Sequence, residues 1–443
     1  MSPVRVEEEQ PTCLLYRDLH GKKPETVVEA RGSYVFLDDG RKILDACAGA
    51  AVASIGHGDQ RVIQAVASQM TTLSYHHTSR LTNPAAERLG QMLVGNRPGG
   101  LSHAIFLSSG SEANESAIKL ARQFFVEKGE TDRVHIISRN NSYHGNSIGC
   151  VSLTGIPSRR RHFEPILMQH TSRVSPCYPY RYKTDGETDE TYAQRLGDEL
   201  EQEILRVGPG RVAAFFAETV GGAAAGNLTP VPGYFQAIRR VCDKYGVLLV
   251  LDEIMCGMGR TGKMHAWEWE AVLMQQHVVD GLKRGSGAFA NGQTFQCHPA
   301  AAAAGVAVLS IFESDDVVAV CAKRGAELHR SLIESLGDHP NVGEIRGRGL
   351  FLSIEFVKDK NTKATFSQGL PLASMLDNAI FDRGVSVYSG FGKGTADGVV
   401  GDHILFSPPL NISSSEIEEL VKAVKEGVDE VFSRDEVQRE LVV

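Results

Sequence analysis

Three small residues stand where this sequence could bind a phosphate group. Ser109, Gly110 and Ser111 follow a short apolar run at 104–107 and begin a helical pattern. The first N–H groups of a helix are unpaired and its dipole is positive there, so small residues at a strand-to-helix turn let these groups converge on an anion. A helix that is merely capped by serine explains the same residues, and both interpretations stay open. We expect the inward face of this helix to be formed by Ala113, Ala117, Leu120, Ala121 and Phe124.

A carboxylate stands at the end of another apolar run. The residues at 247–251 are all aliphatic, and Asp252 follows them. Ligands of open α/β sheets bind at the carboxyl ends of strands, and a buried acid needs a cation or a charged donor as its partner. Asp252 is therefore a candidate for holding a cationic group, and a strand-end acid that faces water is the alternative. Tyr143 and His144 follow the run at 134–137, and such a pair taken alone is more often packing than chemistry.

The elements that must position these residues alternate between strands and helices. Helical stretches separate four apolar runs, which lie at 104–107, 134–137, 212–216 and 247–251. Short unbroken apolar runs between helices are typical of a parallel sheet that is covered on both faces. The sequence therefore predicts an α/β fold with a mainly parallel central sheet.

The two ends of the chain predict a smaller α+β unit. In the last hundred residues, 343–357 is expected to form a strand, and Ser413 with Glu416 forms a capping box at the start of a final helix. Near the other end a helix begins at Asp59, after β-rich segments at 26–30, 34–37 and 42–45. We divide the chain into an N-terminal part of the small domain, a large domain and a C-terminal small domain, with the bounds 1–60, 61–330 and 331–443.

Composition excludes several other classes of protein. Of the 443 residues, 42% are hydrophobic and 23% are charged, as in globular proteins with a sizeable core. The net charge of −8 argues against a nucleic-acid binder. Because no run of 18 apolar residues occurs and the N-terminus is acidic, we expect no membrane span and a cytoplasmic location. The eight cysteines are scattered without a Cys-x-x-Cys pair, so we expect neither a metal site nor disulfides.

Ten segments in this order resemble the class III (ω-type) aminotransferases, which use pyridoxal 5′-phosphate on the fold-type I scaffold. They are LDACAG at 44–49, GHG at 56–58, SGSEAN at 109–114, IKLAR at 118–122, SYHG at 142–145, AETVGG at 217–222, LDEIMCGMGRTG at 251–262, GQTF at 292–295, HP at 298–299 and GRGL at 347–350. Each segment alone is weak evidence, but ten in register are specific. The resemblance runs from about residue 28 to residue 432.

The resemblance implies a cofactor site, a small-molecule amine and a keto acid as substrates, and a homodimer. Its cofactor-binding residues would be Gly110, Ser111, Tyr143, His144, Glu218, Asp252 and Thr294. Gly110 and Ser111 would hold the phosphate, Tyr143 would stack on the pyridine ring, and Asp252 would pair with the pyridinium N–H. Thr294 resembles the residue that reaches the phosphate from the neighbouring subunit, so each site would be shared.

The segment that carries the family's Schiff-base lysine has no counterpart here. In the family, a Lys-Gly-Leu segment lies between a Gly-Arg-Thr-Gly motif and a Gly-x-Thr motif. Here 259–262 is followed by 265–270 and then by a stretch that resembles the residues after the lysine. About two dozen residues are missing, and the lysine, which both forms the covalent link and moves the proton, is missing with them. A lost or mis-spliced exon and a paralogue without catalysis both explain the gap.

The remaining lysines of this region are poor substitutes. Lys283 lies 31 residues after Asp252, as in the family, but only 11 residues before Thr294, where the family has a far longer interval. We interpret Lys283 and Lys263 as surface charges, and we assign no catalytic residue.

One further departure concerns the substrate. Some family members carry an arginine just before the Pro-Pro motif, which grips a carboxylate with a bidentate fork. Leu405 stands in that place here. This favours transfer from an amine or ω-amino acid to a pyruvate-like acceptor over specificity for 2-oxoglutarate, by a ping-pong mechanism. The alternative is a catalytically impaired pseudo-enzyme that binds the cofactor or a partner.

Overall fold

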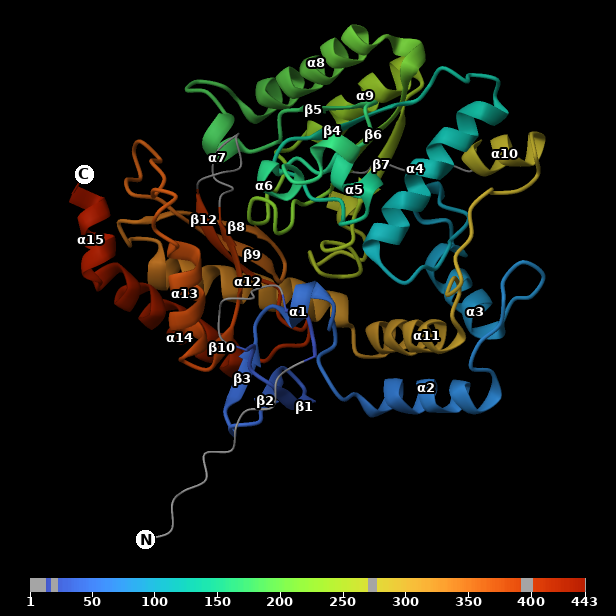
Figure 1. The fold of residues 1–443 in the computed structure, drawn as a ribbon. Helices are drawn as coiled ribbons and strands as arrows, with labels where there is room; N and C mark the ends of the chain where they lie inside the picture. The colour runs from blue at the N-terminus through green and yellow to red at the C-terminus, as the bar shows by residue number, and fades with distance from the viewer. Residues whose placement is uncertain (1–12, 17–22, 270–276, 392–400, 443) are drawn as a thin grey trace.

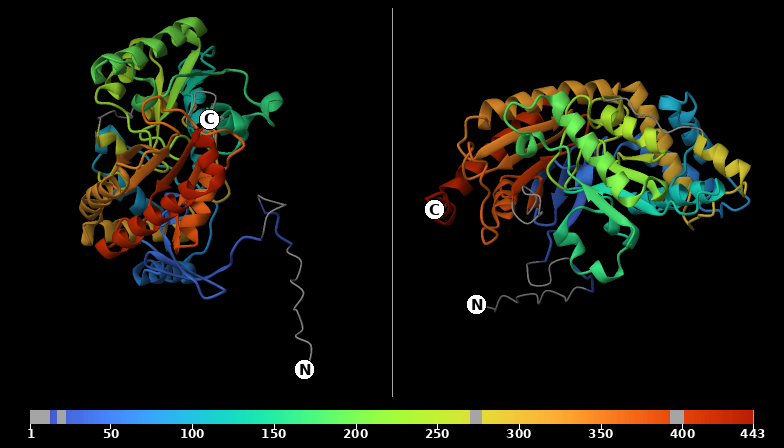
Figure 2. Two further views of the ribbon diagram at one scale, coloured as in Figure 1. Left: turned by 90° about the vertical axis from the view of Figure 1, so that its left-hand side faces the viewer. Right: turned by 90° about the horizontal axis from the view of Figure 1, so that it is seen from above.

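A computed structural model describes residues 13–16, 23–269, 277–391 and 401–442. The described elements are arranged around three four-stranded sheets (Figure 1). Two further views show the N-terminal strands, drawn in blue, beside the C-terminal elements, drawn in orange and red (Figure 2). The part of the chain drawn in green forms the other end of the molecule.

The largest body is built on a parallel sheet. Its strands are β4 (His135–Arg139), β5 (Thr171–Val174), β6 (Val212–Glu218) and β7 (Leu248–Asp252), in the order β5-β4-β6-β7. All three strand pairings are parallel. The prediction of an α/β fold with a parallel central sheet is therefore confirmed.

Helices cover both faces of this sheet because its side chains alternate between the faces. On one face, α8 (Asp189–Val207) and α9 (Tyr234–Tyr245) pack against Ile137 and Phe215. On the other face, α4 (Gly110–Glu127) and α5 (Ile148–Leu153) pack against the neighbouring positions of the same strands.

The apolar run at 104–107 forms no strand, which corrects the prediction. Within the described residues, the sheet ends at β7, and no strand lies between β7 and this run. Backbone groups form a strand only where a neighbouring strand satisfies them. In the described structure, the carbonyl of Phe106 accepts the N–H of Cys297 at 2.9 Å, but no strand pairs with this run.

Of the other two sheets, one joins residues from both ends of the chain and the other is built from the C-terminal part alone. The first consists of β1 (Val27–Arg31), β2 (Tyr34–Leu37), β3 (Lys42–Asp45) and β10 (Val385–Ser386). β10 pairs with β3 in parallel, so residues near position 385 lie beside the N-terminal strands. The second sheet has the order β11-β12-β9-β8, so its outer strands are β11 (Tyr388–Phe391) and β8 (Val342–Arg348), and β12 (Asp402–Phe406) and β9 (Phe351–Phe356) lie between them.

The segment predicted as one strand at 343–357 is a hairpin. β8 (Val342–Arg348) and β9 (Phe351–Phe356) pair antiparallel around a tight turn. Gly349 stands in this turn with a φ of +56°, a conformation that glycine adopts without strain. The prediction of one strand passed over Gly347 and Gly349, whose positive φ angles mark the turn.

The C-terminal helix follows its prediction. α14 (Ser414–Ser433) begins at the capping box formed by Ser413 and Glu416. Its buried face includes six aliphatic residues at helical spacing: Ile417, Leu420, Val421, Val424, Val428 and Val431. α12 (Val317–Leu336), α13 (Leu372–Phe381) and α15 (Asp435–Val442) complete this body.

The remaining helices connect or flank these bodies. They are α1 (Ala48–Ala51), α2 (Gln60–Thr72), α3 (Pro84–Val94), α6 (Pro157–Arg160), α7 (Pro179–Tyr182), α10 (His277–Arg284), α11 (Pro299–Ser314) and the short 3₁₀ turns η1 (Pro98–Gly100), η2 (Glu164–Ile166), η3 (Pro209–Arg211) and η4 (Ala266–Trp269). In the described part of the chain, no helix is both long and apolar enough to span a bilayer.

Candidate active site

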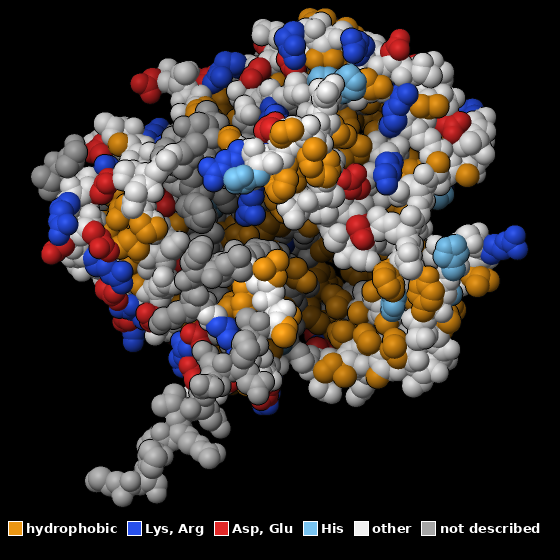
Figure 3. Space-filling view, in the orientation of Figure 1, with side chains coloured by type: hydrophobic (Ala, Val, Ile, Leu, Met, Phe, Trp, Pro, Cys, Tyr) orange, Lys and Arg blue, Asp and Glu red, His pale blue; other side chains and the backbone are white. Residues whose placement is uncertain are grey.

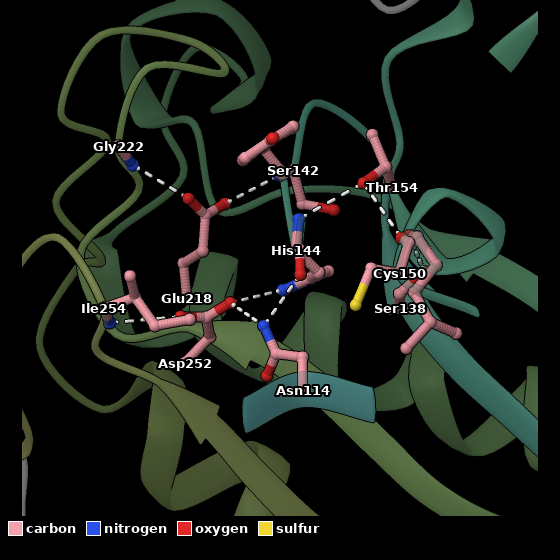
Figure 4. Close-up of polar contacts among 12 residues, drawn as sticks. Asn114, Ser138, Ser142, His144, Cys150, Thr154, Glu218, Gly222, Asp252 and Ile254 are labelled. Atoms are coloured by element: carbon pink, nitrogen blue, oxygen red, sulfur yellow. Dashed lines mark hydrogen bonds and ion pairs between the residues drawn. The ribbon is translucent and has the colours of Figure 1, made fainter. Parts of the chain in front are cut away.

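Three polar side chains meet at the carboxyl end of the parallel sheet (Figure 4). Asp252, the last residue of β7, is buried. Its Oδ2 atom accepts a hydrogen bond from Nδ2 of Asn114 at 2.8 Å and faces Nδ1 of His144 at 2.9 Å. Its Oδ1 atom accepts only the backbone N–H of Ile254, at 3.1 Å, among the described contacts. One carboxylate oxygen is therefore held by two side chains, and the other can accept a further donor.

The two side-chain donors come from different elements and join them to the carboxylate. Asn114 lies on α4, about one turn after Gly110, and also donates to the backbone carbonyl of His144 at 2.8 Å. His144 must carry its proton on Nδ1, because only a donor can face the carboxylate at this distance. These contacts bring the start of α4 and the loop after β4 to the end of β7.

Glu218 is a second buried carboxylate of this site. It is the last residue of β6 and lies directly beside Asp252 in the sheet register. Its two oxygens accept the backbone N–H of Gly222 at 2.9 Å and of Tyr143 at 3.3 Å. Burial raises the pKa of the Glu218 carboxyl, and the nearby charge of Asp252 adds to the rise.

The N-terminus of α4 lies next to these carboxylates. Ser109 caps the helix, as its side chain accepts the N–H of Glu112 at 3.2 Å. Gly110 and Ser111 follow as the first helical residues, so both the anion site and the serine cap that were weighed as alternatives are compatible with this helix start. A Cβ atom on Gly110 would lie 2.8 Å from the side chain of Ile254, which explains the need for glycine there.

The loop after β4 places an aromatic ring at the same site. Tyr143 is half-buried, and the guanidinium of Arg159 lies 5.9 Å from the centre of its ring. The following turn is held close to α4, because Ser111 Oγ accepts the N–H of Asn146 at 2.9 Å. Gly145 is required in this turn, where φ is +126° and a Cβ atom would lie 2.7 Å from Ser111 Oγ.

Thr294 lies outside this cluster. Its side chain is exposed, in the loop before α11. The preceding residues run along α4 of the same chain, where Nδ2 of Asn291 donates to Ser116 Oγ at 2.9 Å and Lys119 donates to Asn291 Oδ1 at 3.0 Å. The role of Thr294 across a subunit interface remains a prediction.

Lys283 lies far from Asp252. It is exposed on α10, between Gly281, which lies against Phe124, and Gly285, which lies against Glu127. Phe124 and Glu127 are at the C-terminal end of α4, about 20–25 Å along the helix from Gly110 at 1.5 Å per residue. Lys283 therefore cannot reach a group that is bound between Gly110 and Asp252.

Two residues with a place in this site were not predicted. Asn114 is the last residue of the SGSEAN motif. Its position about one helical turn after Gly110 and Ser111, the predicted phosphate-binding residues, could have indicated that it belongs to the site. Ile254 is 53% exposed, although it is aliphatic and stands two residues after the buried Asp252. An exposed aliphatic side chain beside a candidate ligand site offers an apolar wall.

The arrangement fits a flat, positively charged heteroaromatic ring that carries a phosphate. Asp252 Oδ1 can accept a ring N–H, Tyr143 and Ile254 supply apolar surfaces, and Gly110 and Ser111 present helix N–H groups to an anion. Pyridoxal phosphate combines these features. The residues present are therefore compatible with the cofactor that the sequence implies.

Comparisons with known proteins agree with this geometry. The profile of the family described as Aminotransferase class-III matches residues 19–273 and 267–428. An uncharacterized aminotransferase of Schizosaccharomyces pombe is 44% identical over 427 residues, which cover 92% of this chain and 93% of the relative. The putrescine–pyruvate aminotransferase of Pseudomonas aeruginosa is 30% identical, over 94% of this chain and 92% of the relative.

A solved structure shares the fold at similar coverage. The crystal structure of a thermostable (S)-enantioselective omega-transaminase from Thermomicrobium roseum matches with a TM-score of 0.86 and 34% identity, over 93% of each chain. Since the family profile and these relatives each span most of the sequence, the chain belongs to the class III aminotransferases, a family of enzymes that depend on pyridoxal phosphate.

Proposed function

We propose that this protein binds pyridoxal phosphate at the cluster around Asp252, in a site built to move an amino group from an amine or ω-amino acid to a keto acid. The supporting observation is the buried Asp252, whose Oδ2 is held by Asn114 and His144 while its Oδ1 can accept a ring N–H. The family's reaction is ping-pong, so donor and acceptor would use the same site in turn.

Each residue of the site has a separate task in this proposal. Gly110 and Ser111 bind the phosphate through helix N–H groups, and Tyr143 covers one face of the ring. Asp252 keeps the ring nitrogen protonated, and Asn114 and His144 are positioning residues that orient its carboxylate. The bound cofactor supplies an electron sink for the negative charge that develops on the substrate carbon.

The preference for a pyruvate-like acceptor is supported by Leu405. This residue of β12 is buried and packs with Val220 and Cys256, from the loops that follow Glu218 and Asp252. An aliphatic side chain at this position offers no charge to a second substrate carboxylate. A relative that is named a putrescine–pyruvate aminotransferase is compatible with this preference.

A second candidate function is binding of the cofactor with impaired catalysis. The observation that favours it is the position of Lys283. The residues of α4 beside it lie about 20–25 Å along the helix from Gly110, where the phosphate would bind. Lys263 is exposed in the turn that follows the glycine-rich segment after β7. The chain would then hold the cofactor without a lysine that can move the proton.

The free cysteines of the described residues support a reducing, cytoplasmic location for either function.

The acceptor preference can be tested in a version of the chain that carries a relative's lysine-bearing segment between residues 270 and 271. With an ω-amine as donor, pyruvate is expected to be used at least about tenfold better than 2-oxoglutarate, since a bidentate Arg–carboxylate contact is absent. Leu405→Arg should narrow this ratio. Equal use of both acceptors by the chain with Leu405 would contradict the proposal, and the chain without the segment serves as the background control.

We also propose a homodimer. Phe295, which follows Thr294, is 57% exposed, and its ring lies 6.0 Å from that of Tyr75, which is 41% exposed. Leu81, in the same loop between α2 and α3 as Tyr75, is 60% exposed. Figure 3 shows hydrophobic side chains around a hollow between the body that carries α4 and the layer of α2, α3 and α11. A second copy of the chain would remove this surface from water.

Sedimentation at micromolar concentration is expected to show twice the chain mass of 48.1 kDa. Phe295→Glu should shift the protein towards the monomer, because it places a charge in an apolar contact. Phe163→Glu is the matched control, since Phe163 is 43% exposed in a different part of the chain. If the chain without substitutions sediments as a monomer, the proposal of a cofactor site shared by two subunits is wrong.

A further inference from the structure

Arg159 lies beside the candidate active site and is exposed there. Its guanidinium lies 5.9 Å from the centre of the Tyr143 ring, which would cover the cofactor. Among the described residues, no carboxylate forms an ion pair with it. The acid nearest to it in the sequence, Glu164, pairs with Arg160 instead, at 3.0 Å. The charge of Arg159 is therefore available to an anionic group that enters the site.

The turn that carries Arg159 is fixed to the loop of Tyr143 by backbone hydrogen bonds. The N–H of Gly155 donates to the carbonyl of Ser142 at 2.9 Å, and the N–H of Asn141 donates to the carbonyl of Gly155 at 3.0 Å. α6 begins two residues after Gly155. Because these bonds join the residues just before Tyr143 to those just before α6, the backbone of Arg159 keeps its place beside the Tyr143 ring.

The next residue, Arg160, anchors the same turn in the interior of the protein. It is buried, and its Nη1 donates to the backbone carbonyls of Ser152, Val151 and Thr154, at 2.7, 2.9 and 3.2 Å. These carbonyls lie at the end of α5, where the C=O groups of a helix have no partners within the helix. Two adjacent arginines thus differ in their tasks, because Arg160 satisfies the backbone whereas the charge of Arg159 stays in contact with water.

Arg139 and Leu405, two other residues that could decide how the site treats a carboxylate, offer no free positive charge. Arg139 is buried at the end of β4, and its Nη2 donates to the backbone carbonyl of Glu218 at 2.6 Å. Leu405 stands where some family members carry an arginine, and it is uncharged. A donor with a carboxylate at its far end would therefore find its cation in Arg159.

We propose that Arg159 binds the distal carboxylate of an ω-amino acid, and that the donor belongs to this class rather than to the amines without a carboxylate. A guanidinium presents two parallel N–H groups that match the two oxygens of a carboxylate. The exposed side chain can turn towards such a group, since no described ion pair fixes it. This inference rests on the proposed function, because it takes the cofactor to lie against Tyr143 and then narrows the class of donor.

The test measures the binding of stable conjugates in which a phosphopyridoxyl group is joined to the amine of the donor, so it needs neither turnover nor a lysine. Conjugates of β-alanine, γ-aminobutyrate and δ-aminovalerate are compared by calorimetry with the conjugates of their uncharged amides. For at least one chain length, we expect the acid to bind about three- to tenfold tighter than its amide, between the effects of an exposed ion pair and of a charged hydrogen bond.

Three variants show whether Arg159 causes this preference. Arg159→Gln should abolish most of it and leave the affinity for the amide conjugates unchanged, and Arg159→Lys should keep a part, because it retains the charge but not the fork. Arg161→Gln is the matched control and should keep the full preference. It removes an equal charge from the same segment, at an exposed side chain whose Nε contacts Nε2 of His162 at 3.3 Å.

Equal binding of acid and amide at every chain length would overturn the inference, as would a preference that persists in Arg159→Gln or disappears equally in Arg161→Gln. An equal loss of affinity for both kinds of conjugate in Arg159→Gln would also overturn it, because Arg159 would then support Tyr143 without touching the donor. The amide conjugates report on the cofactor site alone. If they fail to bind, the proposed function is wrong and this inference falls with it, whereas amides that bind without a preference for the acids contradict only the role of Arg159.

Discussion

Borohydride reduction of the purified chain with pyridoxal phosphate is expected to leave no pyridoxyl group on Lys283 or Lys263, and transamination should stay at background. The physical reason for Lys283 is distance. The residues of α4 beside it lie about 20–25 Å along the helix from Gly110, so its amine cannot reach a cofactor whose phosphate binds there. Loss of a positioned acid–base group alone lowers a rate by roughly 10²- to 10⁴-fold, and loss of the covalent step adds to this.

Peptide mapping after reduction, together with an absorption titration, decides this prediction. The titration should still show saturable binding of the cofactor, because Gly110, Ser111, Tyr143 and Asp252 are all present, but without the visible band of a protonated Schiff base with lysine. Lys283→Ala should leave both results unchanged. A pyridoxyl group on Lys283 with normal transamination would show that the lysine segment was wrongly judged to be missing.

Asp252→Asn is expected to weaken the binding of pyridoxal phosphate by about ten- to a hundredfold, in line with the 1.5–3 kcal/mol of a hydrogen bond to a charged group. The variant keeps the shape of the side chain but removes the charge that holds the ring nitrogen protonated. In the version that carries a relative's lysine-bearing segment, the same substitution should lower turnover by orders of magnitude, since an unprotonated ring is a poor electron sink.

Equilibrium titration of the cofactor into the two proteins measures this effect. Asp132→Asn is the matched control, because Asp132 is exposed and lies outside the site. Thermal unfolding of both variants without cofactor separates a loss of affinity from a loss of folding. If the variant binds the cofactor with the same affinity as the unchanged chain, Asp252 does not pair with the ring nitrogen.

The sequence by itself determined the elements whose pattern is local. The runs at 134–137, 212–216 and 247–251 are short, aliphatic and flanked by helices, and they form three of the four strands of the parallel sheet. The capping box at Ser413 begins α14 because both of its hydrogen bonds join residues three positions apart. The order of motifs determined the family, since ten segments in register do not recur by chance.

Only the tertiary structure decided which residues meet. Asn114 and Asp252 are separated by 138 positions, and their hydrogen bond exists because α4 starts where β7 ends. No sequence period encodes such a contact. The position of Asn114 in its motif places it near the start of α4, but only the fold shows that it reaches Asp252. The same holds for Lys283, whose spacing along the chain resembles that of the family although its helix packs at the far end of α4.

The run at 104–107 shows the physical reason for this limit. Its residues have the pattern of a buried strand, yet in the described structure it pairs with no strand, and Ile105 and Leu107 line a cavity instead. A strand depends on hydrogen bonds to a neighbour that is distant in the sequence, whereas a helix satisfies its own backbone. The sequence therefore predicted α4, the helix that begins at Gly110, correctly. Whether the run at 104–107 pairs with a neighbouring strand depends on the fold.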